Sequence, residues 1–91
     1  MMVNKNERTY TGVNTRWGDQ ICEGDIINTK PARYLVVKKG KEWKLKVIFT
    51  GMQGFETYHD LSNVTNYSGF ILGNKYDNPE LIDKEFPGNE D

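Results

Sequence analysis

The chain has 91 residues, which is enough for one small domain with a single hydrophobic core. Its 12 basic and 13 acidic side chains leave a formal net charge of −1. This balance excludes a general electrostatic attraction to nucleic acid or to an anionic membrane. The hydrophobic share of 36% is sufficient for a small core and excludes an intrinsically disordered chain.

The cysteine content and the apolar runs indicate the cellular setting. Cys22 is the only cysteine, so the chain cannot form an internal disulfide, on which small secreted domains usually depend. No apolar run approaches the roughly 20 residues that span a bilayer, and the first residues lack the apolar stretch of a signal peptide. The sequence therefore predicts a cytoplasmic protein without a membrane partner.

The chain is expected to consist of a flexible N-terminal arm (1–8), a single β domain (9–83) and an acidic C-terminal tail (84–91). The arm is polar and without periodicity, and the tail has little to bury beyond Phe86. Between them, turn signals recur at intervals that are too short for a long helix and that suit strands.

The first predicted element is Ile21–Asn28, either a short strand pair or a bulged strand interrupted at Gly24. A β-hairpin follows, with strands at 33–38 and 43–50 joined by residues 39–42. In its second strand, apolar and mostly polar residues alternate, which predicts one buried face. The apolar face comprises Trp43, Leu45, Val47 and Phe49, and the other face comprises Lys44, Lys46, Ile48 and Thr50.

The C-terminal part is expected to add two strands and a short helix. Phe55–His59 is the weaker strand, Leu61–Val64 is a single turn, and Tyr67–Leu72 is the last strand. A helix is predicted at about 79–84, because Asn78-Pro79-Glu80 combines a capping residue, a proline suited to the first helical position and an acid at the positive end.

The predicted fold class is mostly β: a small, partly open β-barrel of about five or six short strands with a short C-terminal helical turn. The run Tyr34–Val37 leaves neither face of its strand polar. This favours a central strand, or a strand whose second face is covered by another element or a second subunit.

Two motifs contain polar residues whose pattern favours a structural role in turns over a role in binding or catalysis. Glu23 and Asp25 flank Gly24, and neighbouring carboxylates can bind a cation, but two carboxylates alone make a poor site and Asp is common in turns. Gly73-Asn74 is expected to let the backbone leave the last strand, because Asn tolerates left-handed geometry. Both motifs are therefore interpreted as structural.

His59-Asp60 is the single histidine–carboxylate neighbourhood in the sequence. Nucleophilic catalysis would require Cys22 within about 3 Å of the imidazole. One Cys and one His are also a poor zinc set, because structural zinc takes four N or S ligands. The sequence accordingly predicts no catalytic residue, no metal and no cofactor.

The stretch from Lys30 to Lys46 contains seven basic side chains against one acid, Glu42, a local charge of +6. With aromatic residues nearby, it could grip a phosphate backbone and stack a base. Alternatively, its lysines keep the hairpin soluble and block edge-to-edge pairing. Acids in 77–91 could screen it or pair with it in a neighbouring subunit. The candidate nucleic-acid-binding residues are Lys38, Lys39, Lys41, Lys44 and Lys46.

Four segments together resemble the YopX family, a group of small proteins found mostly in phages and prophages of bacteria. The resemblance covers residues 9–82, and its most specific parts are an E-G-D-I-[IV] turn and a G-N-x-Y-[DE]-N-P-E-L block. It implies a small β-rich fold and a mobile-element origin, but no catalytic residues, because the family's function is uncharacterised. The segments are Tyr10–Gly12, Cys22–Ile27, Tyr34–Val37 and Leu72–Ile82.

The favoured function is that of a phage- or prophage-encoded accessory protein that acts without catalysis by binding a host or phage protein, or itself as a homo-oligomer. The alternative is a small-barrel nucleic-acid-binding protein that uses the basic hairpin 38–46. A small enzyme or nucleotide-binding protein built around Cys22, His59 and Asp60 is the least favoured of the three.

Overall fold

The computed structural model describes residues 9–29, 32–51, 56–61, 69–82 and 86. This part of the chain is mostly β, as predicted. The expectations for the arm (1–8), for most of the tail and for a turn at 62–64 lie outside the described residues. The elements are β1 (Tyr10–Asn14), β2 (Gln20–Cys22), β3 (Asp25–Asn28), β4 (Ala32–Lys39), β5 (Glu42–Thr50), β6 (Tyr58–Asp60), β7 (Phe70–Asn74) and the 3₁₀ turn η2 (Pro79–Leu81).

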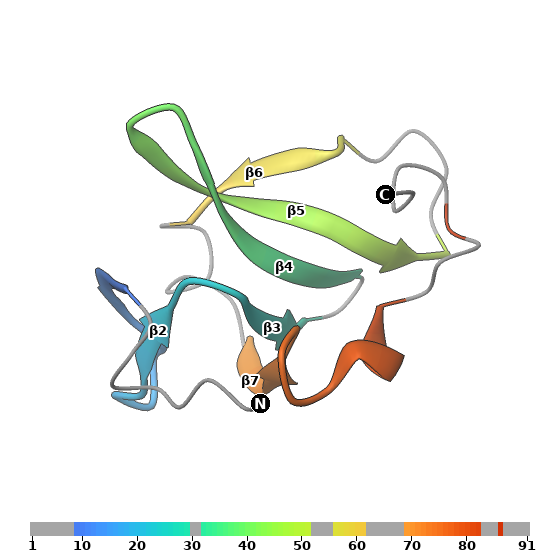
Figure 1. Ribbon diagram of the computed structural model, residues 1–91, viewed down its shortest axis with the longest axis horizontal. Coiled ribbons are helices and arrows are strands. Elements are labelled where there is room, and N and C mark those ends of the chain that lie inside the picture. The colour runs from blue at the N-terminus through green and yellow to red at the C-terminus, as the bar shows by residue number, and fades with distance from the viewer. Residues whose placement is uncertain (1–8, 30–31, 52–55, 62–68, 83–85, 87–91) are drawn as a thin grey trace.

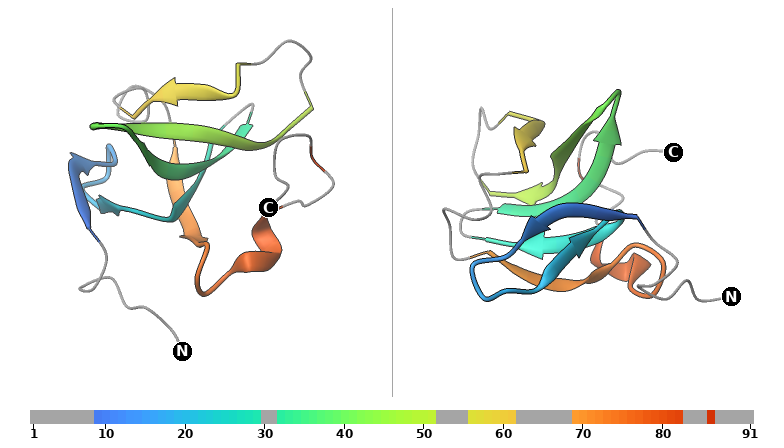
Figure 2. Two further views of the ribbon diagram at one scale, coloured as in Figure 1. Left: turned by 45° about the horizontal axis from the view of Figure 1, so that its top comes forward. Right: turned by 90° about the vertical axis from the view of Figure 1, so that its left-hand side faces the viewer.

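The strands form two antiparallel sheets. One sheet has five strands in the order β6-β5-β4-β3-β7, and the other consists of β1 and β2 (Figure 1). Within the described residues, β6 and β7 are the two edges of the larger sheet and do not pair with each other (Figure 2). The expected barrel is therefore not confirmed. The turn at Glu23-Gly24 passes the chain from the small sheet to the large one, so β2 and β3 pair in different sheets.

The predicted hairpin is confirmed as β4 and β5, with Lys39 opposite Glu42 at its end. Gly40 in the connection has a φ of +66°, a left-handed conformation that glycine adopts without strain. β4 lies between β3 and β5 and is therefore the central strand of the sheet, which explains why Tyr34–Val37 has no polar face.

A β-bulge in β5 changes the predicted alternation. Arg33 lies opposite Phe49 and Tyr34 lies opposite Val47, so Ile48 is an extra residue on β5. Ile48 is fully buried, whereas Phe49 is 46% exposed. The predicted faces are correct up to Val47 and wrong for these two residues, because one inserted residue shifts the phase of everything after it.

The core lies on one face of the five-stranded sheet and is closed by the small sheet. Ile21 of β2 packs with buried side chains of the central strands, and Val13 of β1 contributes a partly buried contact. Phe86, the apolar residue of the predicted tail, also packs against this cluster. The buried members of the cluster are Ile21, Ile27, Ala32, Tyr34, Val36, Leu45, Val47 and Leu61.

Several boundaries differ from the prediction. The segment Ile21–Asn28 is interrupted at Gly24, but its two strands belong to different sheets, and β1 was not predicted as a strand. β6 and β7 lie later in the chain than predicted. The C-terminal helix is a single 3₁₀ turn, and Asn78 makes no side-chain capping bond to it. Instead, the Asn78 side chain accepts a hydrogen bond from the Asn74 N–H at 3.3 Å.

Candidate functional site at the motif junction and the basic hairpin

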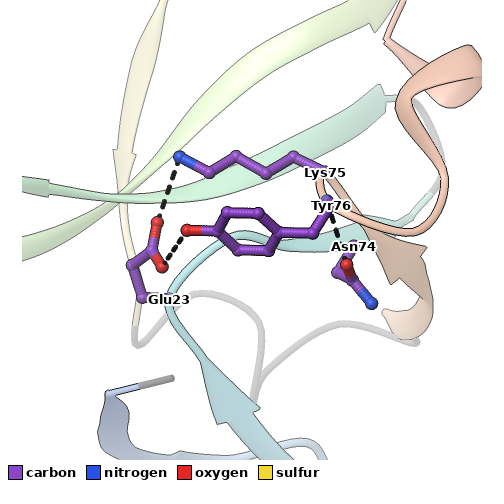
Figure 3. A network of polar contacts seen from close by, with 4 residues as sticks. All are labelled: Glu23, Asn74, Lys75 and Tyr76. Atoms are coloured by element: carbon purple, nitrogen blue, oxygen red, sulfur yellow. Dashed lines mark hydrogen bonds and ion pairs between the residues drawn. The ribbon is translucent and has the colours of Figure 1, made fainter. Parts of the chain in front are cut away.

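The two motifs that carry the family resemblance meet in space. Glu23 of the first motif contacts two side chains of the second, one with each carboxylate oxygen (Figure 3). The Tyr76 hydroxyl donates to Glu23 Oε1 at 2.6 Å, and Lys75 Nζ lies 3.1 Å from Glu23 Oε2. The Lys75 ammonium also lies 5.2 Å from the centre of the Tyr76 ring. We call this contact the motif junction: Glu23, Gly24, Lys75 and Tyr76.

Gly24 connects the motif junction to the large sheet through its backbone and packs closely against Tyr76. Its N–H donates to the Val36 carbonyl at 3.0 Å, and its own carbonyl accepts from the Lys75 N–H at 2.9 Å. A Cβ atom at this position would lie 2.9 Å from Tyr76 Cε2, and the φ of +85° is left-handed. Only glycine satisfies both the conformation and the close approach of the tyrosine ring.

Asp25 supports the same turn from the interior. It is 1% exposed, and its Oδ2 accepts a hydrogen bond from the Cys22 N–H at 2.8 Å. Glu23 and Asp25 therefore bind different partners, the first on the surface and the second inside. In the described ranges, no group of three or more His, Cys, Asp or Glu side chains is placed to hold a metal ion. These contacts support the structural interpretation of the turn.

The Gly73-Asn74 motif is structural for a different reason than predicted. Among the described residues only glycines have positive φ, so Asn74 is not left-handed. Instead, the Asn74 Oδ1 accepts the N–H groups of Tyr76 at 3.0 Å and Asp77 at 2.9 Å and so holds the turn. A Cβ on Gly73 would lie 2.8 Å from Asn78 Cγ, so this glycine provides room for the asparagine side chain.

Hydrogen bonding within the motif junction shifts two pKa values. The bond to Glu23, followed by desolvation, raises the pKa of Tyr76. For Lys75, desolvation lowers the pKa, but the bond and the charge of Glu23 together with Tyr76 outweigh it, and the net pKa is raised. Both groups therefore hold their protons more tightly in the folded protein than in the unfolded chain.

We expect Tyr76→Phe to destabilise the protein at neutral pH by about 0.5–1 kcal/mol, a value reduced for solvent exposure. The folded pKa of Tyr76 is raised, so the advantage of the wild type is fully present below the ordinary tyrosine pKa of 10.0 and is lost as the pH rises through the raised value. Urea unfolding of both proteins from pH 7 to pH 12 measures this difference. A difference that stays constant across that range would contradict the prediction.

The five lysines of the basic hairpin have different surroundings. Lys38 Nζ lies 5.5 Å from the centre of the Trp43 ring, and Lys39 Nζ lies 4.3 Å from the centre of the Tyr58 ring. Lys44 Nζ is 2.5 Å from Asp60 Oδ1. This hydrogen bond raises the pKa of Lys44 and lowers the pKa of Asp60.

The strand register distributes the hairpin lysines over two faces and a tip. Lys46 lies opposite Tyr58 and Lys44 opposite Asp60, so these side chains share one face of the sheet. Lys38 lies opposite Trp43 on the core face, and Lys41 lies in the turn. The structure therefore brings Tyr58 to the lysines. Sequence analysis missed it, because the pairing of β6 with β5 joins segments without a short turn between them.

The family assignment rests on the whole length of this domain. The family model described as YopX protein matches residues 4–83. The chain belongs to the YopX family. No curated protein matches it. In this YopX chain, the E-G-D and G-N-K-Y blocks are thus the two halves of one packing contact, which gives the resemblance a physical basis in the fold.

The residues considered for catalysis are engaged in structural contacts in the YopX chain. His59 Nε2 is 2.9 Å from the Glu56 carbonyl oxygen, and its ring meets Tyr34 edge-on with centroids 5.6 Å apart. Asp60 is bound to Lys44, on the opposite side of β6 from its neighbour His59. Cys22 is buried in the other sheet, and strands β4 and β5 lie between β6 and the Gly24 turn.

Of the acids in 77–91 that were expected to screen the basic hairpin, the two that the structure describes lie away from it, and the others lie outside the described residues. Asp77 and Glu80 lie at or beside η2, and this turn and the hairpin tip are at opposite ends of the molecule (Figure 1). Pairing with a neighbouring subunit stays a prediction. No helix in the described ranges is both long and apolar enough to cross a membrane.

Proposed function

We propose that this YopX-family chain is a phage- or prophage-encoded accessory protein that acts by binding another protein of the host or phage, without catalysis. Family membership supports the phage-type origin. The lone cysteine, Cys22, supports a cytoplasmic setting, because small secreted domains usually carry disulfides.

The observation that carries this proposal is the amount of large apolar surface on a small domain. Aromatic side chains are enriched where proteins meet, because they bury much area for little loss of rotamer freedom. This chain exposes them on both sheets rather than at one edge. The exposed large apolar residues are Tyr10, Trp17, Phe49, Tyr58, Phe70, Leu72 and Tyr76.

The absence of catalysis is part of the proposal and has its own support. Cys22 is buried, His59 contacts Tyr34 and the Glu56 carbonyl, and Asp60 pairs with Lys44. A nucleophile and a base must lie within hydrogen-bonding reach of each other. These three side chains are held by other partners on different elements of the fold.

Chemical cross-linking of the full chain in the cells that produce it tests the proposal. We expect one protein to be cross-linked at a fixed stoichiometry, and the purified pair to form a saturable complex in calorimetry. Self-association alone, or cross-links only to abundant proteins without saturation, would contradict it. Light scattering of the purified chain separates a homo-oligomer from a complex with another protein.

A second candidate function, binding of single-stranded nucleic acid, is favoured by the surroundings of Tyr58. Tyr58 is 37% exposed and lies on the same sheet face as Lys44 and Lys46, with Lys39 Nζ over its ring. An exposed aromatic ring framed by lysines is the arrangement that stacks a base and contacts the flanking phosphates. The short contact to Asp60 weakens this candidate, because it already occupies Lys44.

Fluorescence anisotropy with a labelled oligothymidine at about 50 and about 200 mM salt measures this second function. We expect Tyr58→Ala to weaken binding by about tenfold through lost stacking, and Tyr58→Phe to retain most of it. Lys39→Gln should reduce the slope of log K against log salt by about 0.7. The matched control is Arg16→Gln, a basic residue on the other sheet. No salt-sensitive binding at micromolar protein rejects the candidate.

A further inference from the structure

Trp17 is the most exposed large apolar residue of the described chain, with 57% of its surface accessible. It lies in the turn between β1 and β2. A tryptophan in a soluble domain usually buries most of its ring. Its exposed ring at the tip of a hairpin is therefore available for contact with a partner.

The turn that carries Trp17 is held rigidly by a buried threonine. Thr15 is 4% exposed, and its Oγ1 accepts the N–H groups of Trp17 at 3.3 Å and Asp19 at 3.2 Å. Its N–H donates to the Asp19 carbonyl at 2.9 Å, and its carbonyl accepts from the Gly18 N–H at 2.9 Å. Four bonds to one residue fix the loop, so the indole is displayed in a defined position before any partner arrives.

Two further side chains extend the surface around Trp17. The Arg16 guanidinium lies 5.8 Å from the centre of the Trp17 ring, and no ion pair within the described part of the chain involves Arg16. The Tyr10 hydroxyl donates to Asn14 Oδ1, and Asn14 Nδ2 donates to the Gly18 carbonyl at 3.3 Å. These bonds connect the 43%-exposed Tyr10 to the turn. Trp, Tyr and Arg are the residues that most often dominate binding energy.

We propose that the Trp17 surface, defined by Tyr10, Arg16 and Trp17, docks into an apolar pocket of a folded partner protein that has a carboxylate beside the pocket for Arg16. This inference rests on the proposed function and names its surface. The charge of the segment favours a protein over a polyanion: between residues 9 and 22, Arg16 is the single base and Asp19 the single acid. A phosphate backbone or an anionic membrane would require several bases here.

Site-specific photo-cross-linking of the full chain in the producing cells tests this surface. A benzoylphenylalanine probe replaces exposed Gln20, next to the turn, or exposed Phe70 on β7 as the distant control. We expect the Gln20 probe to capture one protein, and the cross-linked peptide to line an apolar pocket that contains Asp or Glu. The captured protein, once purified, is then titrated with variants of the chain.

In that titration, Trp17→Ala should weaken binding by about 30-fold or more, as expected for a buried anchor. Arg16→Glu should weaken it more than Arg16→Ala, because the partner supplies a carboxylate. Glu80→Ala, on the exposed turn η2, is the control and should leave affinity within about twofold. Circular dichroism confirms that each variant is folded; Trp17 is exposed, so its replacement should leave the melting temperature nearly unchanged.

The outcomes separate the surface from the general proposal. Capture through the Phe70 probe, with affinity unaffected by Trp17→Ala, would overturn the Trp17 surface and leave a protein-binding function elsewhere on the chain. Capture of nucleic acid or of a second copy of the chain at Gln20 would overturn the committed partner. No specific cross-link at either position would overturn both proposals.

Discussion

Gly24→Ala should destabilise the protein by about 3 kcal/mol, which is a large fraction of the stability of a domain of this size. The left-handed φ of +85° is strained for alanine, at about 1–2 kcal/mol, and the new Cβ would lie 2.9 Å from the Tyr76 ring. Displacing that ring also disturbs its hydrogen bond to Glu23. Urea denaturation followed by fluorescence measures the loss.

Gly12→Ala is the matched control for this substitution. Gly12 has nearly the same φ, +87°, but a Cβ there would meet no atom within 4 Å. It should therefore show the conformational cost alone, about 1–2 kcal/mol. The difference between the two variants isolates the close packing of Tyr76 on Gly24. Equal costs would show that the motif junction does not depend on that contact.

Asp25→Ala should also cost about 3 kcal/mol. The carboxylate is 1% exposed and accepts the Cys22 N–H, so its removal leaves a buried donor without this acceptor, at about 1–3 kcal/mol, and opens a cavity. We expect the connection between the two sheets to loosen first. Hydrogen exchange should show faster exchange at the Cys22 amide than in the wild type, beyond the change in global stability.

Asp77→Ala provides the comparison on the surface. Asp77 is exposed and accepts a hydrogen bond from Asn74 Nδ2 at 3.2 Å. Its replacement should cost about 0.5 kcal/mol or less. If Asp25→Ala were as mild as Asp77→Ala, the acidic residue of the E-G-D turn would not have the structural role that its burial indicates.

Gly24→Ala and Asp25→Ala both test why the residues of the YopX family motifs occur together. Glu23 and Tyr76 are 53 residues apart in the sequence and are joined by a hydrogen bond in the structure. The glycine of the first motif is required both by its own left-handed φ and by the close approach of the tyrosine of the second. The proposals for binding concern other surfaces, at Trp17 and Tyr58.

Sequence analysis identified the candidate lysines but not their partners. Lys38 and Lys44 were predicted as members of one basic stretch, yet the first packs on Trp43 and the second pairs with Asp60. Trp17 and Tyr58, which carry the two binding proposals, were not singled out. Their exposure depends on the pairing of β1 with β2 and of β6 with β5. No local sequence pattern indicates which face of a short strand will be buried by other elements.

The sequence by itself determined the β class, the hairpin of β4 and β5, the interruption at Gly24 and the family. These features depend on alternation within a strand and on the conformations that turn residues allow, both of which act over a few neighbouring residues. Only the tertiary structure decided that two sheets form instead of a barrel, that the bulge at Ile48 inverts the end of β5, and that the two motifs meet. Those outcomes depend on contacts between segments that are far apart in the chain. The energies of such contacts are not determined by the sequence of either segment alone.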